Sequence, residues 1–189
     1  MPRPPILPTI NWKSIFESGL SYADWIQQGE RMDRADDIQQ MLSEQVLSNT
    51  AATALKALSR PVYVVAIAEN WCGDVVRHVP VLQKMAQESE QLKVSYIARE
   101  GNEDVFVRFV TNGGEAIPKF VFLNNNFVEC GNWGPMPQAL RVLIARGKAS
   151  GQGGEARQRV SEAYAADPDR LETLSELMDL VEIASAEVP

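Results

Sequence analysis

Cys72 is the side chain in this protein that is best placed for chemistry. It lies in the segment A-E-N-W-C-G-D-V at 68–75, directly after an apolar run at 62–68. Where a strand ends and a helix begins, free backbone N–H groups and the positive end of the helix dipole stabilise a thiolate. Because the thiolate is the nucleophilic form, we expect a reactive Cys72 with a pKa somewhat below the usual ~8.5. The alternative is a small packing residue, since free cysteine is often buried.

Asp74, two positions after Cys72, acts on this thiol in two opposing ways. The helix dipole stabilises its carboxylate, which can also cap free N–H groups. The same negative charge disfavours a thiolate nearby. We expect Asp74 to lie at the surface, where solvent screens part of the repulsion, so that the helix terminus still stabilises the thiolate on balance.

The elements that must position Cys72 are a buried strand and a helix. The run at 62–68 is short, β-branched and apolar on both faces, which is typical of a strand in a parallel sheet. Apolar residues then recur at helical spacing over 73–90, with Pro80 inside the helix, where it should bend the axis. Further strands are predicted near 93–98, 119–123 and 127–131, and further helices near 103–111 and 136–147.

The order of several motifs resembles the thioredoxin family. The tripeptide W-C-G at 71–73 follows the first strand, Pro80 stands eight positions after the cysteine, and an Ile-Pro step stands at 117–118. A glycine follows the last strand at 131 or 134. The resemblance covers roughly residues 55–148. It implies an α/β thioredoxin-like fold, with a central mixed sheet of about four to five strands flanked by helices, and added N-terminal and C-terminal helices.

A closer resemblance is to bacterial thioredoxin-like proteins with a single active-site cysteine, whose function is largely unknown. These proteins carry W-C-G-D in place of W-C-G-P-C, as this chain does at 71–74. They also carry T-N-G-G before the Ile-Pro step, here at 111–114, and W-G-P after the last strand, here at 133–135.

The resemblance implies a substrate groove beside the catalytic Cys72. A cis bond before Pro118 would leave the backbone of Ile117 free to pair with a substrate strand. Trp71, Trp133 and Pro135 would wall an apolar groove, although aromatic residues in these places could also belong to the core. The groove residues implied in this way are Trp71, Gly73, Asp74, Ile117, Pro118 and Trp133.

Two departures from thioredoxin limit what Cys72 can do. Val75 stands where the second cysteine of the C-x-x-C pair is expected, and Ala66 stands where thioredoxins have a buried aspartate. Cys72 could therefore form a mixed disulfide, but another thiol must resolve it. Cys130, on the last strand, is a candidate resolving thiol if its Cα lies within ~7 Å of that of Cys72. The alternative for Cys130 is a small strand residue.

Composition argues against several other classes of protein. The net charge is −7, with no basic cluster for nucleic acid or an anionic membrane. With no run of ~18 apolar residues and no apolar signal segment at the start, we expect a cytoplasmic protein outside the membrane.

His78, the only histidine, is expected on the exposed side of its helix, and with two distant cysteines it makes no metal site. We expect no cofactor.

Three regions are predicted along the chain, packed as one globular unit. Residues 1–58 form an N-terminal helical extension that starts with a proline-rich, extended segment at 1–10. Residues 59–148 form the thioredoxin-like domain. Residues 149–189 form a C-terminal helical extension, reached through a glycine-rich linker at 147–154, with helices near 155–166 and 168–185.

These observations leave two hypotheses for function. In the first, Cys72 exchanges with protein or glutathione thiols and disulfides as a monothiol redox protein, regenerated by an outside thiol. In the second, the fold is a redox-inactive binding module that holds a peptide or protein partner in the groove, and Cys72 is incidental. Fold alone does not choose between them.

Overall fold

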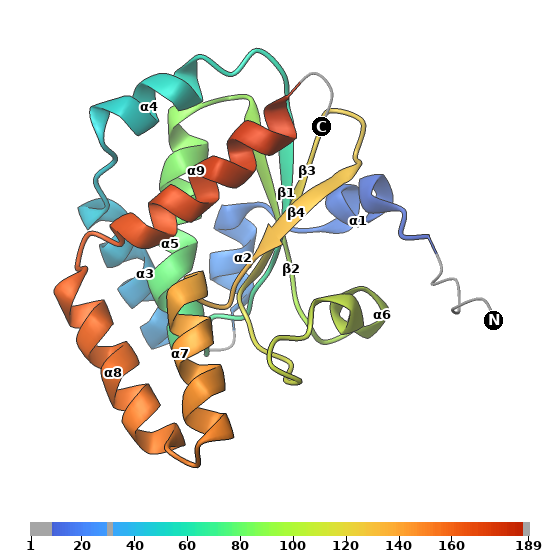
Figure 1. Ribbon diagram of the computed structural model, residues 1–189. Helices are drawn as coiled ribbons and strands as arrows, with labels where there is room; N and C mark the ends of the chain where they lie inside the picture. The colour runs from blue at the N-terminus through green and yellow to red at the C-terminus, as the bar shows by residue number, and fades with distance from the viewer. Residues whose placement is uncertain (1–8, 30–31, 187–189) are drawn as a thin grey trace.

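A mixed four-stranded sheet with the order β2-β1-β3-β4 forms the centre of the molecule (Figure 1). β1 (Val62–Ile67) pairs in parallel with β2 (Leu92–Ile97) and antiparallel with β3 (Lys119–Leu123), which pairs antiparallel with β4 (Glu129–Trp133). β1 and β3 are the central strands and are almost wholly buried, because each is apolar on both faces. The predicted α/β class and mixed sheet are confirmed.

The computed structural model describes residues 9–29 and 32–186. The extended segment predicted for residues 1–10 therefore lies, apart from residues 9 and 10, outside the described residues. In the part that is described, no helix is long and apolar enough to cross a membrane.

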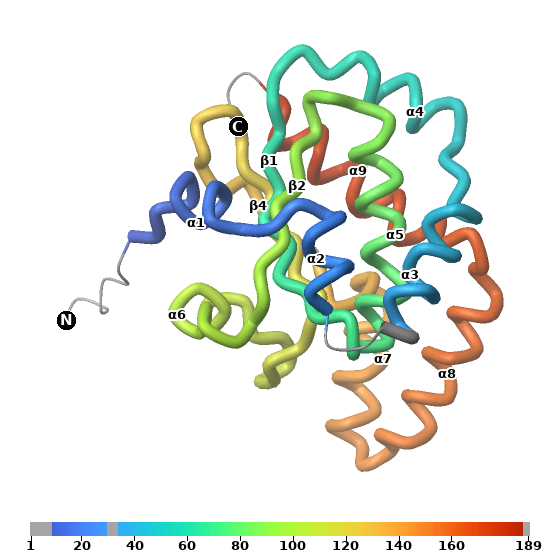
Figure 2. The backbone as a smooth tube through the Cα atoms, turned by 180° about the vertical axis from the view of Figure 1, so that it is seen from behind, coloured from blue at the N-terminus to red at the C-terminus, as the bar shows by residue number. Residues whose placement is uncertain are grey.

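Helices cover both faces of the sheet (Figures 1 and 2). On one face α5 (Gly73–Glu88) lies beside α9 (Leu171–Ser185), with α3 (Met32–Glu44) and α4 (Asn49–Lys56) packed outside α5. On the other lie α1 (Trp12–Ser18), α6 (Glu103–Phe106) and the short 3-10 helix η1 (Val107–Phe109). α7 (Gln138–Ala149) and α8 (Gly153–Ala166) pack side by side at the end of the sheet where β1 ends.

The N-terminal helices are attached to the sheet by specific contacts. Leu20 forms an isolated antiparallel bridge with Tyr96 of β2. α2 (Tyr22–Gln28) starts at the capping residue Ser21 and carries Trp25, whose ring stacks on Tyr96. The indole N–H of Trp25 donates to the carbonyl oxygen of Ala68 at 3.0 Å. The N-terminal extension therefore supports the chain four residues before Cys72.

The glycine-rich segment at 147–154 is not the linker that its composition predicts. Gly147 lies inside α7 and α8 already begins at Gly153, so only a tight turn separates the two helices. A Cβ at Gly147 would stand 2.4 Å from the Cβ of Ala156, so this glycine allows α7 and α8 to approach closely. The predicted linker is therefore reduced to this turn, because Gly147 serves the packing of α7 against α8.

Candidate functional site

Cys72 joins three parts of the fold. It is the N-cap residue of α5, and its backbone N–H donates to the carbonyl oxygen of Glu69 at 3.2 Å. Its thiol donates to the carbonyl oxygen of Ile117 at 3.4 Å. The sulfur is therefore half-buried where the end of β1, the start of α5 and the Ile-Pro step meet.

The peptide bond between Ile117 and Pro118 is cis, as predicted, and so is the bond between Gly134 and Pro135, which was not predicted. Gly134 has φ +119, and a Cβ at this position would stand 2.0 Å from the carbonyl oxygen of Pro118. The ammonium of Lys119 donates to the carbonyl oxygen of Gly134 at 2.7 Å. Burial, with the nearby charge of Arg141, lowers the pKa of Lys119 to about 8. The Gly134–Pro135 step thus packs closely against Pro118 and supports the Ile-Pro step.

The accessible side of Cys72 is formed by its two chain neighbours. The side chain of Trp71 is 40% exposed, and the Arg99 guanidinium lies 5.9 Å from its ring centroid. A Cβ at Gly73 would meet no atom within 4 Å. A carboxylate oxygen of Glu69 accepts the backbone N–H groups of Arg99 and Glu100, which fixes the turn before Trp71. A partner could therefore approach the sulfur past Trp71 and Gly73.

Trp133 is not a wall of this groove. It is only 2% exposed, and its ring stacks on Phe120 with the centroids 5.4 Å apart. Its indole N–H donates to the carboxylate of Glu176 on α9 at 2.6 Å. Pro135 is buried too. Trp133 lies in the core, where α9 packs on β4.

Burial raises the pKa of Cys72 above its ordinary value. The backbone N–H groups of Val75 and Asp74 act in the opposite direction, but the charges of Asp74 and Glu69 raise the pKa further. Asp74 is itself half-buried rather than fully at the surface, and burial raises its pKa as well. The prediction of a lowered thiol pKa was wrong, because the helix terminus does not outweigh the loss of solvent around Cys72.

We expect the rate of Cys72 alkylation by iodoacetamide to reach half its maximum at a pH above the value for an ordinary thiol. The protonated thiol is unreactive, so a raised pKa shifts the reactive form to higher pH. The measurement uses C130S, in which Cys72 is the only thiol, and compares the folded chain with the same chain unfolded in denaturant. A midpoint lower in the folded chain would contradict the raised pKa.

His78 is buried, not exposed as predicted, and it belongs to a polar cluster that the sequence did not reveal. Its ring nitrogens lie 3.1 Å from the hydroxyl of Tyr164 on α8 and 3.0 Å from that of Thr173 on α9. Tyr164 also donates to the carboxylate of Asp74 at 2.9 Å. Asp74 and His78 stand four residues apart on one face of α5, which is a visible sequence signal. Nothing in the sequence marks Tyr164 or Thr173 as their partners.

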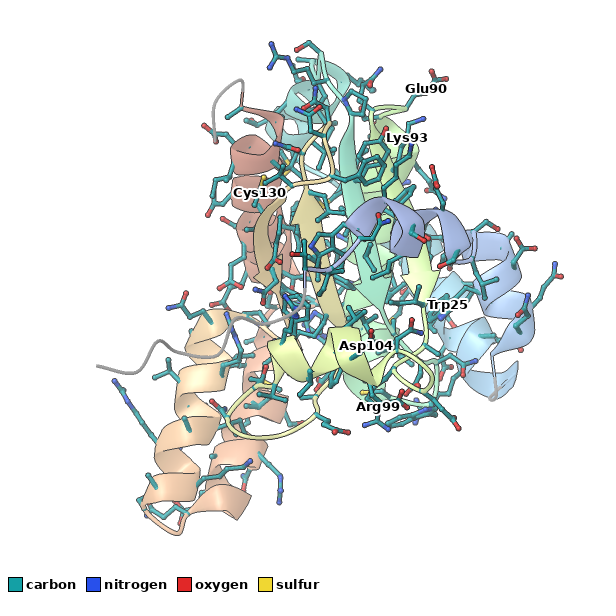
Figure 3. All side chains as sticks on the ribbon, turned by 90° about the vertical axis from the view of Figure 1, so that its right-hand side faces the viewer. Trp25, Glu90, Lys93, Arg99, Asp104 and Cys130 are labelled. Carbon is teal, nitrogen blue, oxygen red and sulfur yellow. The ribbon has the colours of Figure 1, made fainter. Side chains whose placement is uncertain are left out.

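The structure does not bring Cys130 to Cys72. Cys130 lies on β4 next to Glu129, which pairs with Leu123 at the far end of β3, whereas Cys72 contacts Ile117 just before β3 begins. Five or so strand residues at ~3.3 Å each separate the two places, well beyond the ~7 Å that a disulfide allows. The Arg99 guanidinium lies 5.9 Å from the ring centroid of Trp71, the neighbour of Cys72. In Figure 3, Arg99 and Cys130 lie at opposite ends of the sheet. Both cysteines are free.

Among residues 9–29 and 32–186, no group of three or more histidine, cysteine, aspartate or glutamate side chains is arranged to hold a metal ion.

Comparison with protein families matches residues 19–150 to a family model described as thioredoxin. A comparison with curated proteins found no match. The matched residues run from the end of α1 to the end of α7 and include every element that touches Cys72.

Two solved structures are similar to the whole fold. One is the crystal structure of a protein of unknown function from Pseudomonas aeruginosa, with a TM-score of 0.69 and 15% identity, covering 92% of this chain and 98% of that one. The other is the crystal structure of an HIV epitope-scaffold, with a TM-score of 0.67 and 14% identity and the same coverage. At these identities the likeness shows a shared fold.

Proposed function

The chain belongs to the thioredoxin family, and from this premise we propose that it forms and exchanges mixed disulfides through Cys72 as a monothiol protein. The observation that carries the proposal is the position of the sulfur. It lies at the start of α5, against the carbonyl oxygen of Ile117 and next to the exposed Trp71.

The chemistry needs one thiol from this chain. The thiolate of Cys72 attacks one sulfur of a disulfide R–S–S–R′, a new S–S bond to R forms, and R′ leaves as a thiolate that takes up a proton. A second, external thiol then attacks the mixed disulfide and restores Cys72. Val75 is buried at the place of a second thiol and Cys130 is remote, so resolution comes from outside the chain.

The raised pKa of Cys72 favours long-lived mixed disulfides over rapid turnover. A thiol of high pKa is a poor leaving group, so an incoming thiol displaces Cys72 slowly. Glutathione and protein thiols are the partners that we propose, because reducing compartments supply them.

We expect incubation with glutathione disulfide to add one glutathione per chain, at Cys72. The variant C130S should be modified as the parent protein is, and C72S should not, because only Cys72 lies at a helix N-terminus beside an accessible face. Intact-mass and peptide mass spectrometry across a pH series locate and time the adduct.

The binding module remains the second candidate, favoured by the raised pKa of Cys72 and by the buried, non-ionisable Ala66. If Cys72 stays unmodified even at a pH above its pKa, or if Cys130 reacts in its place, the exchange function is wrong and the binding module is favoured.

A further inference from the structure

The hairpin of α7 and α8 is the basic part of an acidic protein. The two helices carry five cations and only two carboxylates, in a chain whose net charge is −7. The cations are Arg141, Arg146, Lys148, Arg157 and Arg159, and the carboxylates are Glu155 and Glu162. No basic run marks these residues in the sequence. They come together because the turn at 150–152 folds α8 back against α7 (Figure 1).

The positive charge of this hairpin is not neutralised within the molecule. Four of its five cations are exposed, namely Arg146, Lys148, Arg157 and Arg159. Within the part of the chain that the structure describes, none of these four forms an ion pair with a carboxylate. Cations elsewhere on the surface are paired, as Arg99 is with Glu115 at 3.5 Å. The hairpin therefore presents positive charge that another molecule can neutralise.

One cleft in the hairpin fits a carboxylate. Arg146 of α7 and Arg159 of α8 line the same cleft, which has a volume of about 290 Å³. Leu143 and Ala156 supply apolar surface there, and Glu155 offsets one of the two positive charges. Guanidinium groups bind carboxylates through paired N–H donors, so two of them from different helices can hold one acidic side chain between them.

The base of the hairpin is attached to the elements around the reactive sulfur. The hydroxyl of Tyr164, near the end of α8, donates at 2.9 Å to Asp74, which stands two residues after the reactive cysteine. The side-chain amide of Asn112, just before the Ile-Pro step, donates at 3.4 Å to the carbonyl oxygen of Arg141. Arg159 stands five residues before Tyr164, which is about 7.5 Å along the helix axis. A protein that covers the sulfur can therefore reach the hairpin as well.

The charges of the rest of the molecule select among anionic partners. The carboxylates of Asp74 and Glu69 act on Cys72, and the second carboxylate oxygen of Glu69 is buried with no hydrogen-bond partner among the residues described. A small anion held at the sulfur meets these carboxylates rather than the hairpin. A long polyanion such as nucleic acid extends beyond the hairpin onto the acidic remainder of the chain. A short acidic protein segment, a few residues away from its disulfide, avoids both kinds of repulsion.

We propose that the α7–α8 hairpin is the docking surface for a short acidic segment of a protein whose disulfide is presented to Cys72. The surface itself rests on the contacts above, whereas the partner's role as a disulfide substrate rests on the exchange function proposed above. A carboxylate of the partner binds between Arg146 and Arg159. Lys148 and Arg157 add attraction that salt screens.

Two peptides that differ only in charge test this surface. Each has one cysteine, activated as a mixed disulfide with 2-thiopyridine, and a few neutral residues between the cysteine and a run of either glutamates or glutamines. At an ionic strength of about 0.01 M, where the Debye length is about 30 Å, the acidic peptide should react with C130S on the order of tenfold faster than the glutamine peptide. The preference should shrink as salt is added, because the hairpin is exposed.

The variant R146Q/R159Q should lose most of this preference by slowing the acidic peptide alone, with the rate constant of the glutamine peptide unchanged. K56Q/K93Q is the matched control, because it removes the same charge at the other end of the sheet. Lys56 ends α4 just before β1, and Figure 3 shows Lys93 of β2 at the opposite end from Arg99. This control should keep the preference. The four replaced side chains are exposed, and circular dichroism verifies that each variant is folded.

The outcomes distinguish the docking surface from the function of the thiol. Equal rate constants for the two peptides, or an equal loss of preference in the two double variants, would overturn the surface and leave exchange at Cys72 intact. If neither peptide reacts, the exchange function fails. The surface is then decided by fluorescence anisotropy with a labelled acidic peptide that has no cysteine. Binding to C72S that R146Q/R159Q weakens supports the surface, and no such binding overturns it. A single-stranded oligonucleotide that binds more tightly than the peptide would overturn the assignment of an acidic protein segment.

Discussion

Replacing Leu177 with alanine should lower the free energy of unfolding by about 2–5 kcal/mol. Leu177 is 0% exposed, and its helix α9 packs against β4, β3, β1 and α5. Removing its side chain from this interior loses buried apolar contact and leaves a cavity. The loss would show that the C-terminal extension is part of the cooperative core that contains Cys72, although the thioredoxin match ends at residue 150.

Denaturant unfolding followed by far-ultraviolet circular dichroism measures this loss. Leu171, at the start of the same helix, is 57% exposed and is the matched control. L171A should change the free energy of unfolding by no more than about 0.5 kcal/mol. Equal effects of the two substitutions would mean that α9 is not packed on the sheet in solution.

Replacing Gly134 with alanine should both destabilise the protein and slow the reaction of Cys72. The backbone of Gly134 has φ +119, which strains any residue with a Cβ, and the new methyl would stand 2.0 Å from the carbonyl oxygen of Pro118. The strain alone costs about 1–3 kcal/mol. Relief of the overlap must displace Pro118, and with it the Ile117 carbonyl that contacts the sulfur.

Two measurements follow the effect of this substitution: the free energy of unfolding and the rate of glutathione addition at Cys72. Gly154, in the first turn of α8, is the matched position, because a Cβ there meets no atom within 4 Å. G154A should leave the addition rate unchanged and should not reduce stability. If G134A behaves like G154A, the Gly-Pro step does not support the Ile-Pro step.

The elements nearest Cys72 could be predicted because their signals are local. The apolar run that forms β1 and the helical spacing that forms α5 depend on residues adjacent in the chain, and both elements lie within two residues of the predicted bounds. The Ile-Pro step was found from its place in the order of the motifs that resemble the thioredoxin family. The central sheet follows from such segments once the topology of the thioredoxin family is assumed.

The environment of the site could not be predicted, because it depends on helices that arrive from the end of the chain. His78 is buried only because α8 and α9 cover it with Tyr164 and Thr173. Trp133 is buried where α9 packs on β4, and Glu176 of α9 accepts its indole N–H. Tyr164 of α8 also contacts the half-buried Asp74, so the direction of the Asp74 pKa shift is a tertiary property that residue order does not reveal.

The placement of the four tryptophans makes events at Cys72 visible by fluorescence. Trp12, Trp25 and Trp133 are buried, whereas Trp71, the immediate neighbour of Cys72, is exposed. A water-soluble quencher such as acrylamide will therefore act mainly on the indole beside the reactive sulfur. The chain thus carries its own optical reporter, and occupancy of the sulfur can be followed in real time without an added dye.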